Sequence, residues 1–300
     1  MSEPVSIVKS IYAFPPLIDH DGVTYRHVVH LGPQGGRAPS TAGHDLDSRV
    51  TALTGLSPLP GRLGEELYAV SGGLHTSFAF EKGSMAVYIV SINQGKVVDS
   101  IPVPDTATMN GMAALPRHPH ILLSADSIDG RILSIDTQKH KVDVLLKHDM
   151  LGPGPIVNTS SPVPPIGING LRVRGDHLYF TNSNQGTFVR VRIDEWGHCM
   201  GDPEILARSP DAAHIYDDFA FDRAGNAYIA THSSSVFKVT PGGVQTALVD
   251  VGGGGGRYAD LLAEPTSATL APDGKSIFVS TGGDFRSFPR KGGQILQIAI

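Results

Sequence analysis

The segment INGLRVRGDHLYFTNSNQGTFVRVRID, residues 168–194, decides the fold of this chain. A polar pair opens it, and three short apolar runs follow, separated by a Gly175 turn and by a polar cluster that ends at Gly186. Apolar residues recur at every second position within the runs, which is the period of a β-strand rather than of a helix. The segment therefore predicts a meander of short strands joined by tight turns.

Three other segments have the same order of polar pair, strand, turn and strand: MNGMAALPRHPHILLSADSIDGRILSID (109–136), DDFAFDRAGNAYIATHSSSVFKVT (217–240) and TSATLAPDGKSIFVSTGG (266–283). A weaker copy begins at Leu53. The copies recur at intervals of about 50 to 60 residues, and a repeat of this size with several strands per unit is typical of a β-propeller blade. The alternative is an all-β sandwich with accidental spacing.

We expect an all-β, six-bladed β-propeller that forms a single domain over residues 1–300, with five blades as the alternative count. Residues 53–300 supply the regular blades. Residues 1–52 are expected to form an irregular first blade and a long loop, because only two strands, at 7–14 and 23–30, are recognisable there. The C-terminal strand is the candidate for completing that first blade.

Composition excludes several classes of protein. The chain has 24 basic and 29 acidic side chains, a net charge of −5, so binding to nucleic acid through phosphate neutralisation is not expected. A single cysteine, Cys199, excludes an internal disulfide framework. No run reaches the roughly 18 to 20 apolar residues of a membrane span. The N-terminal MSEPVSIVKSIYAF lacks the pattern of a signal peptide, so we expect a cytoplasmic protein.

Polar residues are predicted to converge at one mouth of the propeller channel. In antiparallel blades, the start of each innermost strand and the end of the second strand lie at the same face. The predicted starts of the innermost strands carry Thr54, Asn110, Asn169, Asp218 and Ser267. The predicted ends of the second strands carry Asp126, Asn182 and His232. His214 and Tyr216 precede one innermost strand and are expected to overhang the same mouth.

These residue types suit acid–base chemistry and the binding of a polar group. A histidine such as His232 titrates near neutral pH, and coupling between Asp217 and Asp218 can raise one carboxyl pKa for proton transfer. Tyr216 is a candidate donor to an oxyanion. The amide and carboxylate oxygens of Asn169 and its counterparts also suit a hard cation. The alternative is that they cap strand ends or form Asx-turns.

The stretches MNGMAALP, LLSADSIDGRILSID, PIGINGLRVRGDHLYFTN, DDFAFDRAGNAYIATH and EPTSATL with IFVSTGG resemble the SMP-30/gluconolactonase-like family, in particular its fungal branch. The resemblance covers residues 53–300. It implies a six-bladed propeller. For the lactonases it also implies a divalent cation held by a glutamate, two asparagines and an aspartate. Asn110, Asn169 and Asp218 match the amide and aspartate positions, with Asp218 as the base.

The chain departs from the family pattern at the glutamate. The only glutamate in the first 50 residues is Glu3, and Glu65 and Glu66 precede a different strand. The resemblance therefore favours the metal-independent fungal hetero-Diels–Alderases of secondary metabolism. These enzymes convert a hydroxymethyl tropolone or phenol to a quinone methide and join it to a humulene-type olefin, so a small hydrophobic substrate and no cofactor are implied. One alternative is a lactonase or related hydrolase dependent on Ca²⁺, Zn²⁺, Mn²⁺ or Mg²⁺. The other is a non-catalytic binding propeller.

Overall fold

The computed structural model of the protein describes residues 8–13, 50, 52–61, 64–76, 79–155, 164–232, 234–250, 262–282 and 294–300. These residues form five four-stranded antiparallel sheets and one two-stranded hairpin. Within this part of the chain there is no helix with the length and apolar character that crossing a bilayer requires.

The strands are numbered in chain order. The first sheet contains β2 (Ala52–Pro60), β3 (Glu66–Gly73), β6 (Ala86–Ser91) and β7 (Lys96–Pro102). The second contains β8 (Met109–Ala114), β9 (Ile121–Asp126), β10 (Arg131–Asp136) and β11 (Lys141–Lys147). The third contains β12 (Ile168–Arg174), β13 (His177–Asn182), β14 (Thr187–Arg192) and β15 (Glu204–Arg208). The fourth contains β16 (Ile215–Phe221), β17 (Ala227–His232), β18 (Ser235–Val239) and β19 (Gln245–Asp250). The fifth contains β20 (Pro265–Leu270), β21 (Ser276–Thr281), β22 (Gln294–Ala299) and β1 (Val8–Ala13), and the hairpin is β4 (His75–Thr76) with β5 (Ala79–Phe80).

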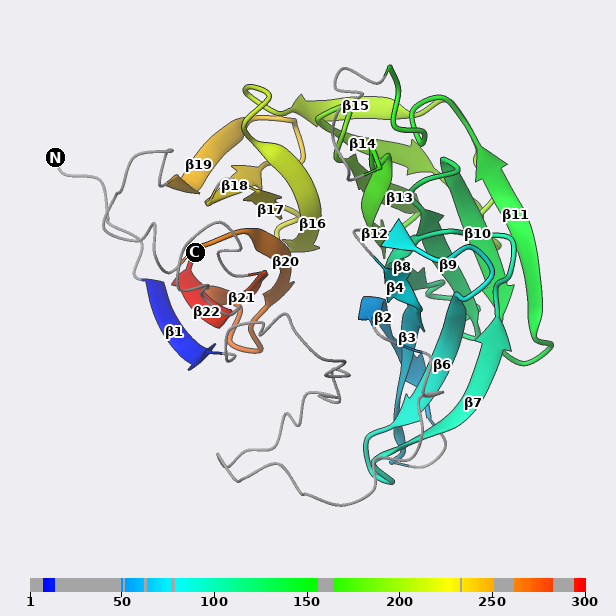
Figure 1. Ribbon diagram of the computed structural model, residues 1–300. Coiled ribbons are helices and arrows are strands. Elements are labelled where there is room, and N and C mark those ends of the chain that lie inside the picture. The colour runs from blue at the N-terminus through cyan, green and yellow to red at the C-terminus, as the bar shows by residue number, and fades with distance from the viewer. Residues whose placement is uncertain are drawn as a thin grey trace, which may run out of the picture.

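The five sheets are arranged radially. Their innermost strands β2, β8, β12, β16 and β20 follow one another around an arc, and each packs against the next (Figure 1). Radially repeated four-stranded antiparallel sheets define a β-propeller. The prediction of an all-β propeller is therefore confirmed. The described residues form five blades, which is the alternative count and not the preferred six.

The N-terminal strand belongs to the last blade. β1 pairs with β22 as the outermost strand of the sheet that begins with β20. The C-terminal strand is thus third in its own sheet and does not complete a separate first blade. The expected pairing between the N-terminal region and the C-terminal strand is therefore present, but within the last blade. The strand predicted at 23–30 lies outside the described residues.

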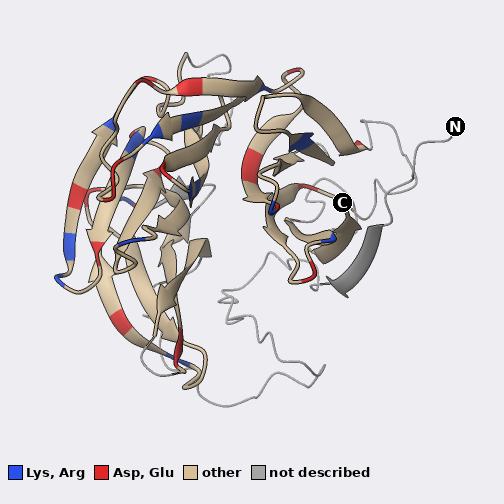
Figure 2. Cartoon of the chain, turned by 180° about the vertical axis from the view of Figure 1, so that it is seen from behind, with Lys and Arg blue, Asp and Glu red and all other residues tan. Residues whose placement is uncertain are grey.

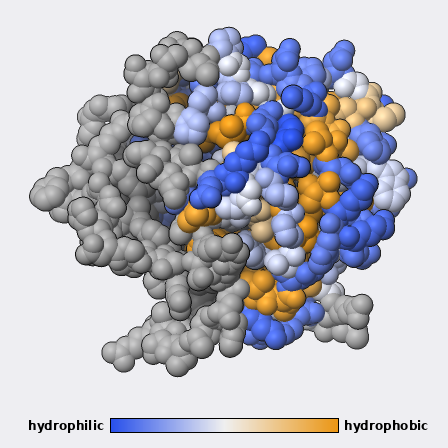
Figure 3. Space-filling model, turned by 45° about the vertical axis from the view of Figure 1, so that its right-hand side comes forward, coloured by the Kyte–Doolittle hydropathy of each residue, from blue (hydrophilic) through white to orange (hydrophobic). Residues whose placement is uncertain are grey.

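Apolar side chains fill the space between neighbouring sheets. The middle strands β6 and β9 are buried along their whole length, whereas β7 and β11 at the outside are largely exposed. Leu123 of the second blade packs in one cluster with Leu171 and Phe180 of the third. Charged residues concentrate on outer strands and turns (Figure 2). The surface seen in Figure 3 alternates hydrophobic and hydrophilic patches.

A β-bulge interrupts every innermost strand near its start. The register against the second strand shifts between Leu53 and Leu56, Met109 and Met112, Ile168 and Leu171, Tyr216 and Phe219, and Pro265 and Ser267. A bulge sets two residues against one and redirects their side chains. The polar positions predicted on the innermost strands all fall at these bulges, so the bulges place them at one end of the blades.

Glycine follows the polar residue in three bulges because the next innermost strand approaches closely. A Cβ atom on Gly111 would lie 2.4 Å from the backbone nitrogen of Leu171, and one on Gly55 would lie 2.1 Å from the carbonyl oxygen of Asn110. The Asn-Gly pairs 110–111 and 169–170 lie inside strands. They permit backbone contact between adjacent blades, which only a residue without a side chain allows.

Candidate functional site

The bulges define which residues are equivalent between blades. The first bulge position is occupied by Thr54, Asn110, Asn169, Asp217 and Thr266. The second is occupied by Gly55, Gly111, Gly170, Asp218 and Ser267. The sequence-based ring of Thr54, Asn110, Asn169, Asp218 and Ser267 is thus wrong by one residue in its last two members. Two aspartates are adjacent in β16, and the strand pattern alone does not say which of them aligns with Asn169.

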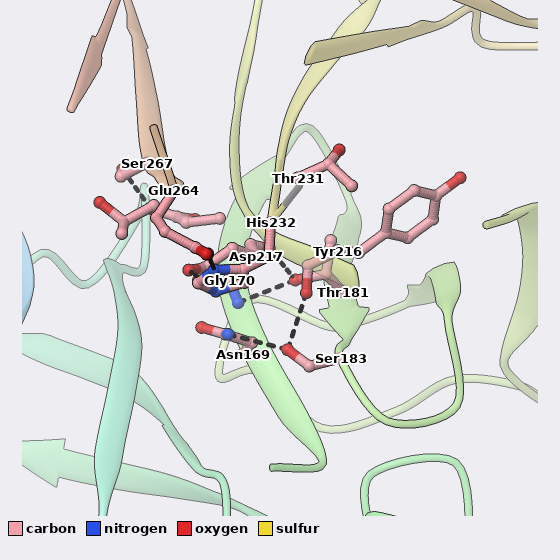
Figure 4. A network of polar contacts seen from close by, with 12 residues as sticks. Asn169, Gly170, Thr181, Ser183, Tyr216, Asp217, Thr231, His232, Glu264 and Ser267 are labelled. Carbon is pink, nitrogen blue, oxygen red and sulfur yellow. Dashed lines mark hydrogen bonds and ion pairs between the residues drawn. The ribbon is translucent and has the colours of Figure 1, made fainter. Parts of the chain in front are cut away.

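His232 forms the centre of an acid–base cluster with Asp217 and Glu264 (Figure 4). The imidazole Nε2 of His232 lies 2.9 Å from Oδ2 of Asp217, and Nδ1 lies 2.7 Å from Oε2 of Glu264. Asp217 comes from β16, His232 ends the neighbouring β17, and Glu264 immediately precedes β20 of the next blade. One imidazole therefore bridges two carboxylates across two blades.

The cluster is arranged to hold a protonated histidine. Burial opposes the positive charge of His232, but hydrogen bonds and attraction from Asp217 and Glu264 outweigh it and raise its pKa to about 10. Burial raises the pKa of the Asp217 carboxyl, while its hydrogen bond to His232 acts in the opposite direction. We conclude that His232 is an imidazolium at neutral pH, because two acceptors flank its two ring nitrogens.

Hydroxyl groups of the third blade hold the backbone of the cluster. Thr181 Oγ1 donates to the carbonyl oxygen of Asp217 and accepts from the N–H of Gly170. Ser183 Oγ donates to the carbonyl oxygen of Tyr216 at 2.7 Å and accepts from Asn169 Nδ2 at 2.9 Å. These bonds satisfy backbone groups that the bulges leave without ladder partners, and they connect β16 to the preceding blade.

Asp218 takes a different role from its neighbour. Its Oδ2 accepts hydrogen bonds from Arg172 Nη2 at 2.6 Å and from Ser267 Oγ at 2.7 Å. Its Oδ1 packs against Gly170, where a Cβ would lie only 2.4 Å away. Asp218 thus joins three innermost strands, β12, β16 and β20. The sequence suggested this residue as the base, but its more accessible oxygen is engaged by a guanidinium.

Most of the other predicted site residues stabilise their own blades. Tyr216 is fully buried and its hydroxyl hydrogen bonds to Gln245 on the outer strand β19, so the structure places it away from the cluster, and Figure 4 shows its ring directed away from His232. One carboxylate oxygen of Asp126, Oδ2, accepts hydrogen bonds from Nε and Nη2 of Arg131.

The remaining predicted residues also have local partners. Asn182 donates to the carbonyl oxygens of Met150 and Gly152. His214 Nδ1 lies 2.8 Å from Asp211. Thr54 shares a hydrogen bond with Ser71. Asn110 lies half-buried in its bulge. The structure therefore brings together Asn169, Asp217, Asp218, His232 and Ser267, and it does not show the other predicted residues in contact with them.

The donor set does not fit a divalent cation. Of the predicted ligands, Asp218 is bound by Arg172 and Ser267, and Asp217, the aspartate in register with Asn169, is bound by His232. Among the described residues, no group of three or more histidine, cysteine, aspartate or glutamate side chains has a geometry that suits a metal. A cation here would have to displace a guanidinium that already neutralises the aspartate.

Sequence reasoning missed two residues of the site. Glu264 stands directly before an innermost strand in the stretch EPTSATL and adopts a positive φ of 53°, which is uncommon for a residue with a side chain. The sequence-based candidates for a strand-entry glutamate were Glu3, Glu65 and Glu66, whereas Glu264 stands at that position in the last repeat. Arg172 carried no such signal, because its partner Asp218 lies in another blade.

A cavity of about 760 Å³ lies beside the site rather than in it. Its walls are formed by the turn at Asp129 and Gly130, by the segment after β11, by Gln185 and by Arg208. None of the residues of the acid–base cluster lines it. Because the turn after β9 and the start of β12 lie at the same end of the blades, the cavity opens on the same face as the site.

Two fungal proteins are similar in sequence to this chain. A protein of Phoma sp. is 27% identical over 199 residues, which cover 60% of this chain and 54% of that protein. A protein of Sarocladium schorii is 45% identical over 58 residues, which cover 18% of this chain and 14% of that protein. Both bear the name "Putative hetero-Diels-Alderase", the second followed by asR5. The match spans about half of the first protein and a small part of the second, and no family model matches the chain.

Solved structures share the fold. A luciferin-regenerating enzyme superposes with a TM-score of 0.55 at 15% identity, covering 83% of this chain and 78% of the other. Regucalcin, a calcium-binding protein of Agrobacterium tumefaciens strain C58, gives a TM-score of 0.54 at 14% identity, covering 86% and 94%. At these identities the likeness shows the β-propeller fold alone.

Proposed function

We propose that this chain is a hetero-Diels–Alderase that forms a quinone methide from a hydroxymethyl tropolone or phenol and adds it to a humulene-type olefin. The observation that carries the proposal is the imidazolium of His232 held between Asp217 and Glu264 at the start of the innermost strands. The names of the two fungal relatives support the same class of reaction.

The first step requires one acid and one base. Loss of water from the hydroxymethyl group transfers a proton to the leaving hydroxyl and removes a proton from the ring hydroxyl, which leaves a neutral quinone methide. His232, with a pKa of about 10, supplies the first proton to the leaving hydroxyl through the carboxylates that it bonds to, Asp217 and Glu264. The same two carboxylates accept the second proton, from the ring hydroxyl. No oxidant or reductant is needed, because water is the only other product.

The second step forms a C–C bond and a C–O bond to the olefin and uses no protein proton. The protein contributes orientation of the two partners and hydrogen bonding to the oxygen that carries partial negative charge. In this proposal Asp217, His232 and Glu264 perform the acid–base work. Asp218, which the sequence suggested as the base, instead holds the strands that carry them.

The test is an incubation of purified protein with a hydroxymethyl tropolone and humulene, followed by mass spectrometry of the adduct formed with loss of water. A thiol added in place of humulene traps the quinone methide and measures dehydration separately. We expect His232→Asn to slow dehydration by about 10²- to 10⁴-fold.

His198→Asn is the matched control, because this exposed histidine also pairs with a carboxylate, that of Asp194, but lies in the turn after β14. It should leave the rate unchanged. Adduct formation no faster than in buffer, or a wild-type rate for His232→Asn, would contradict the proposal.

A further inference from the structure

The site contains a fixed cation supplied by the chain itself. Arg172 lies on β12, three residues after Asn169, and its guanidinium has three separate anchors. Nη2 donates to Asp218 Oδ2 at 2.6 Å, Nη1 donates to the carbonyl oxygen of Leu171 at 2.8 Å, and the guanidinium carbon lies 5.7 Å from the ring centroid of Phe219. A guanidinium held in this way has little freedom to leave Asp218.

Each acidic side chain of this site forms an ion pair with a basic side chain. His232 is shared by Asp217 and Glu264, and Arg172 is paired with Asp218. Side-chain exposure is low for the second pair, 28% for the arginine and 16% for the aspartate, so water screens their attraction only in part. Each carboxylate therefore already has a positive partner from the chain.

Two oxygen atoms beside this pair are buried without a hydrogen-bond partner in the described part of the chain. They are Oδ1 of Asp218 and Oδ1 of Asn169, and Asn169 as a whole is only 4% exposed. The two residues belong to adjacent innermost strands, and Asp218 packs directly on Gly170, the neighbour of Asn169. Carboxylate and amide oxygens that lack donors are the ligands that a hard divalent cation takes.

We infer that Arg172 occupies the role of a divalent cation in this propeller, and that the guanidinium keeps a latent oxygen site closed. Removing its positive charge leaves Asp218 with Ser267 as the remaining donor to Oδ2, and leaves Oδ1 of Asp218 and the side-chain Oδ1 of Asn169 for an ion. The inference rests on these contacts whatever reaction the site performs, and its test measures ion binding rather than turnover.

The experiment compares binding of Mn²⁺ by wild-type protein and by Arg172→Met, using electron paramagnetic resonance of the free ion. We expect no stoichiometric binding by the wild type and one bound Mn²⁺ in the variant, with an affinity at least about tenfold higher than in the wild type.

Arg174→Met is the matched control. This arginine lies two residues further along β12, sits 5.5 Å from the Phe221 ring centroid, and donates to the carbonyl oxygens of Asp222 and Arg223 rather than to a carboxylate. Its removal frees no acidic group, so it should not create a site.

Adding Asp218→Asn to Arg172→Met should abolish the gained binding. Stoichiometric Mn²⁺ on the wild type, equal gains in both arginine variants, or a folded Arg172→Met protein without the gain would overturn the inference. If Arg172→Met does not fold, Arg172→Gln, which retains a hydrogen-bond donor without the charge, takes its place, and the wild-type measurement decides independently.

Discussion

Replacing Gly170 with alanine tests how the innermost strands position the site. The added Cβ would lie 2.4 Å from Oδ1 and 2.7 Å from Cα of Asp218, whereas ordinary contacts begin at 3.4 Å. The backbone of β16 would have to move by about 1 Å, because one of the two opposing atoms is main chain and the other belongs to a side chain held by Arg172 and Ser267.

The magnitude follows from three terms. Overpacking in a close contact costs about 1–3 kcal/mol, and weakening the charge-assisted hydrogen bonds of Asp218 adds about 1.5–3 kcal/mol. Alanine in place of glycine also lowers the entropy of the unfolded chain, which offsets about 0.4–1 kcal/mol of this loss of stability. We therefore expect Gly170→Ala to lower the free energy of unfolding by about 3 kcal/mol.

Urea denaturation followed by far-ultraviolet circular dichroism measures this change. Gly201→Ala is the control, because nothing lies within 4 Å of the Cβ position there and its φ is not positive. It should be neutral or stabilise by up to about 1 kcal/mol. A loss below about 0.5 kcal/mol for Gly170→Ala would refute the close approach of β12 and β16.

Two other predictions concern His232 and Tyr216. The pKa of His232 in the folded protein, about 10, lies above its ordinary value of 6.5, so its contribution to stability is complete below pH 6.5 and is lost as the pH rises through 10. Because about a third of this side chain is exposed, screening reduces the loss to about 1–2 kcal/mol, and a pH series of urea titrations should show it in the wild type and not in His232→Asn. Tyr216→Phe removes the hydrogen bond to Gln245 and should cost about 1 kcal/mol of stability without slowing dehydration of the tropolone; a large rate loss would place Tyr216 in the reaction instead.

Local patterns were sufficient for the architecture of the blades. Alternating apolar residues around 168–194 and their recurrence predicted strands, turns and the propeller class, because burying one face of a strand constrains its own sequence. Six blades were preferred over five because the N-terminal strand was assigned to a blade of its own, whereas β1 pairs with β22 as the outermost strand of the last blade.

The residues that the structure brings together were predicted in part. Asp217 and His232 were proposed from strand ends, and the structure shows them in contact. Glu264 was not predicted, although it stands directly before an innermost strand and this position is readable in the sequence. Arg172 could not have been found, since nothing near it in the sequence indicates that a carboxylate from the next blade lies 2.6 Å away.

By itself, the amino-acid sequence determined that polar residues lie at the start of successive innermost strands, because alternation and turn residues are local properties. Only the tertiary structure decided which of the two adjacent aspartates faces the imidazole and which is bound by the guanidinium. A bulge shifts side chains by one residue, and its position is set by the pairing of β16 with β17 rather than by the alternation within β16 alone.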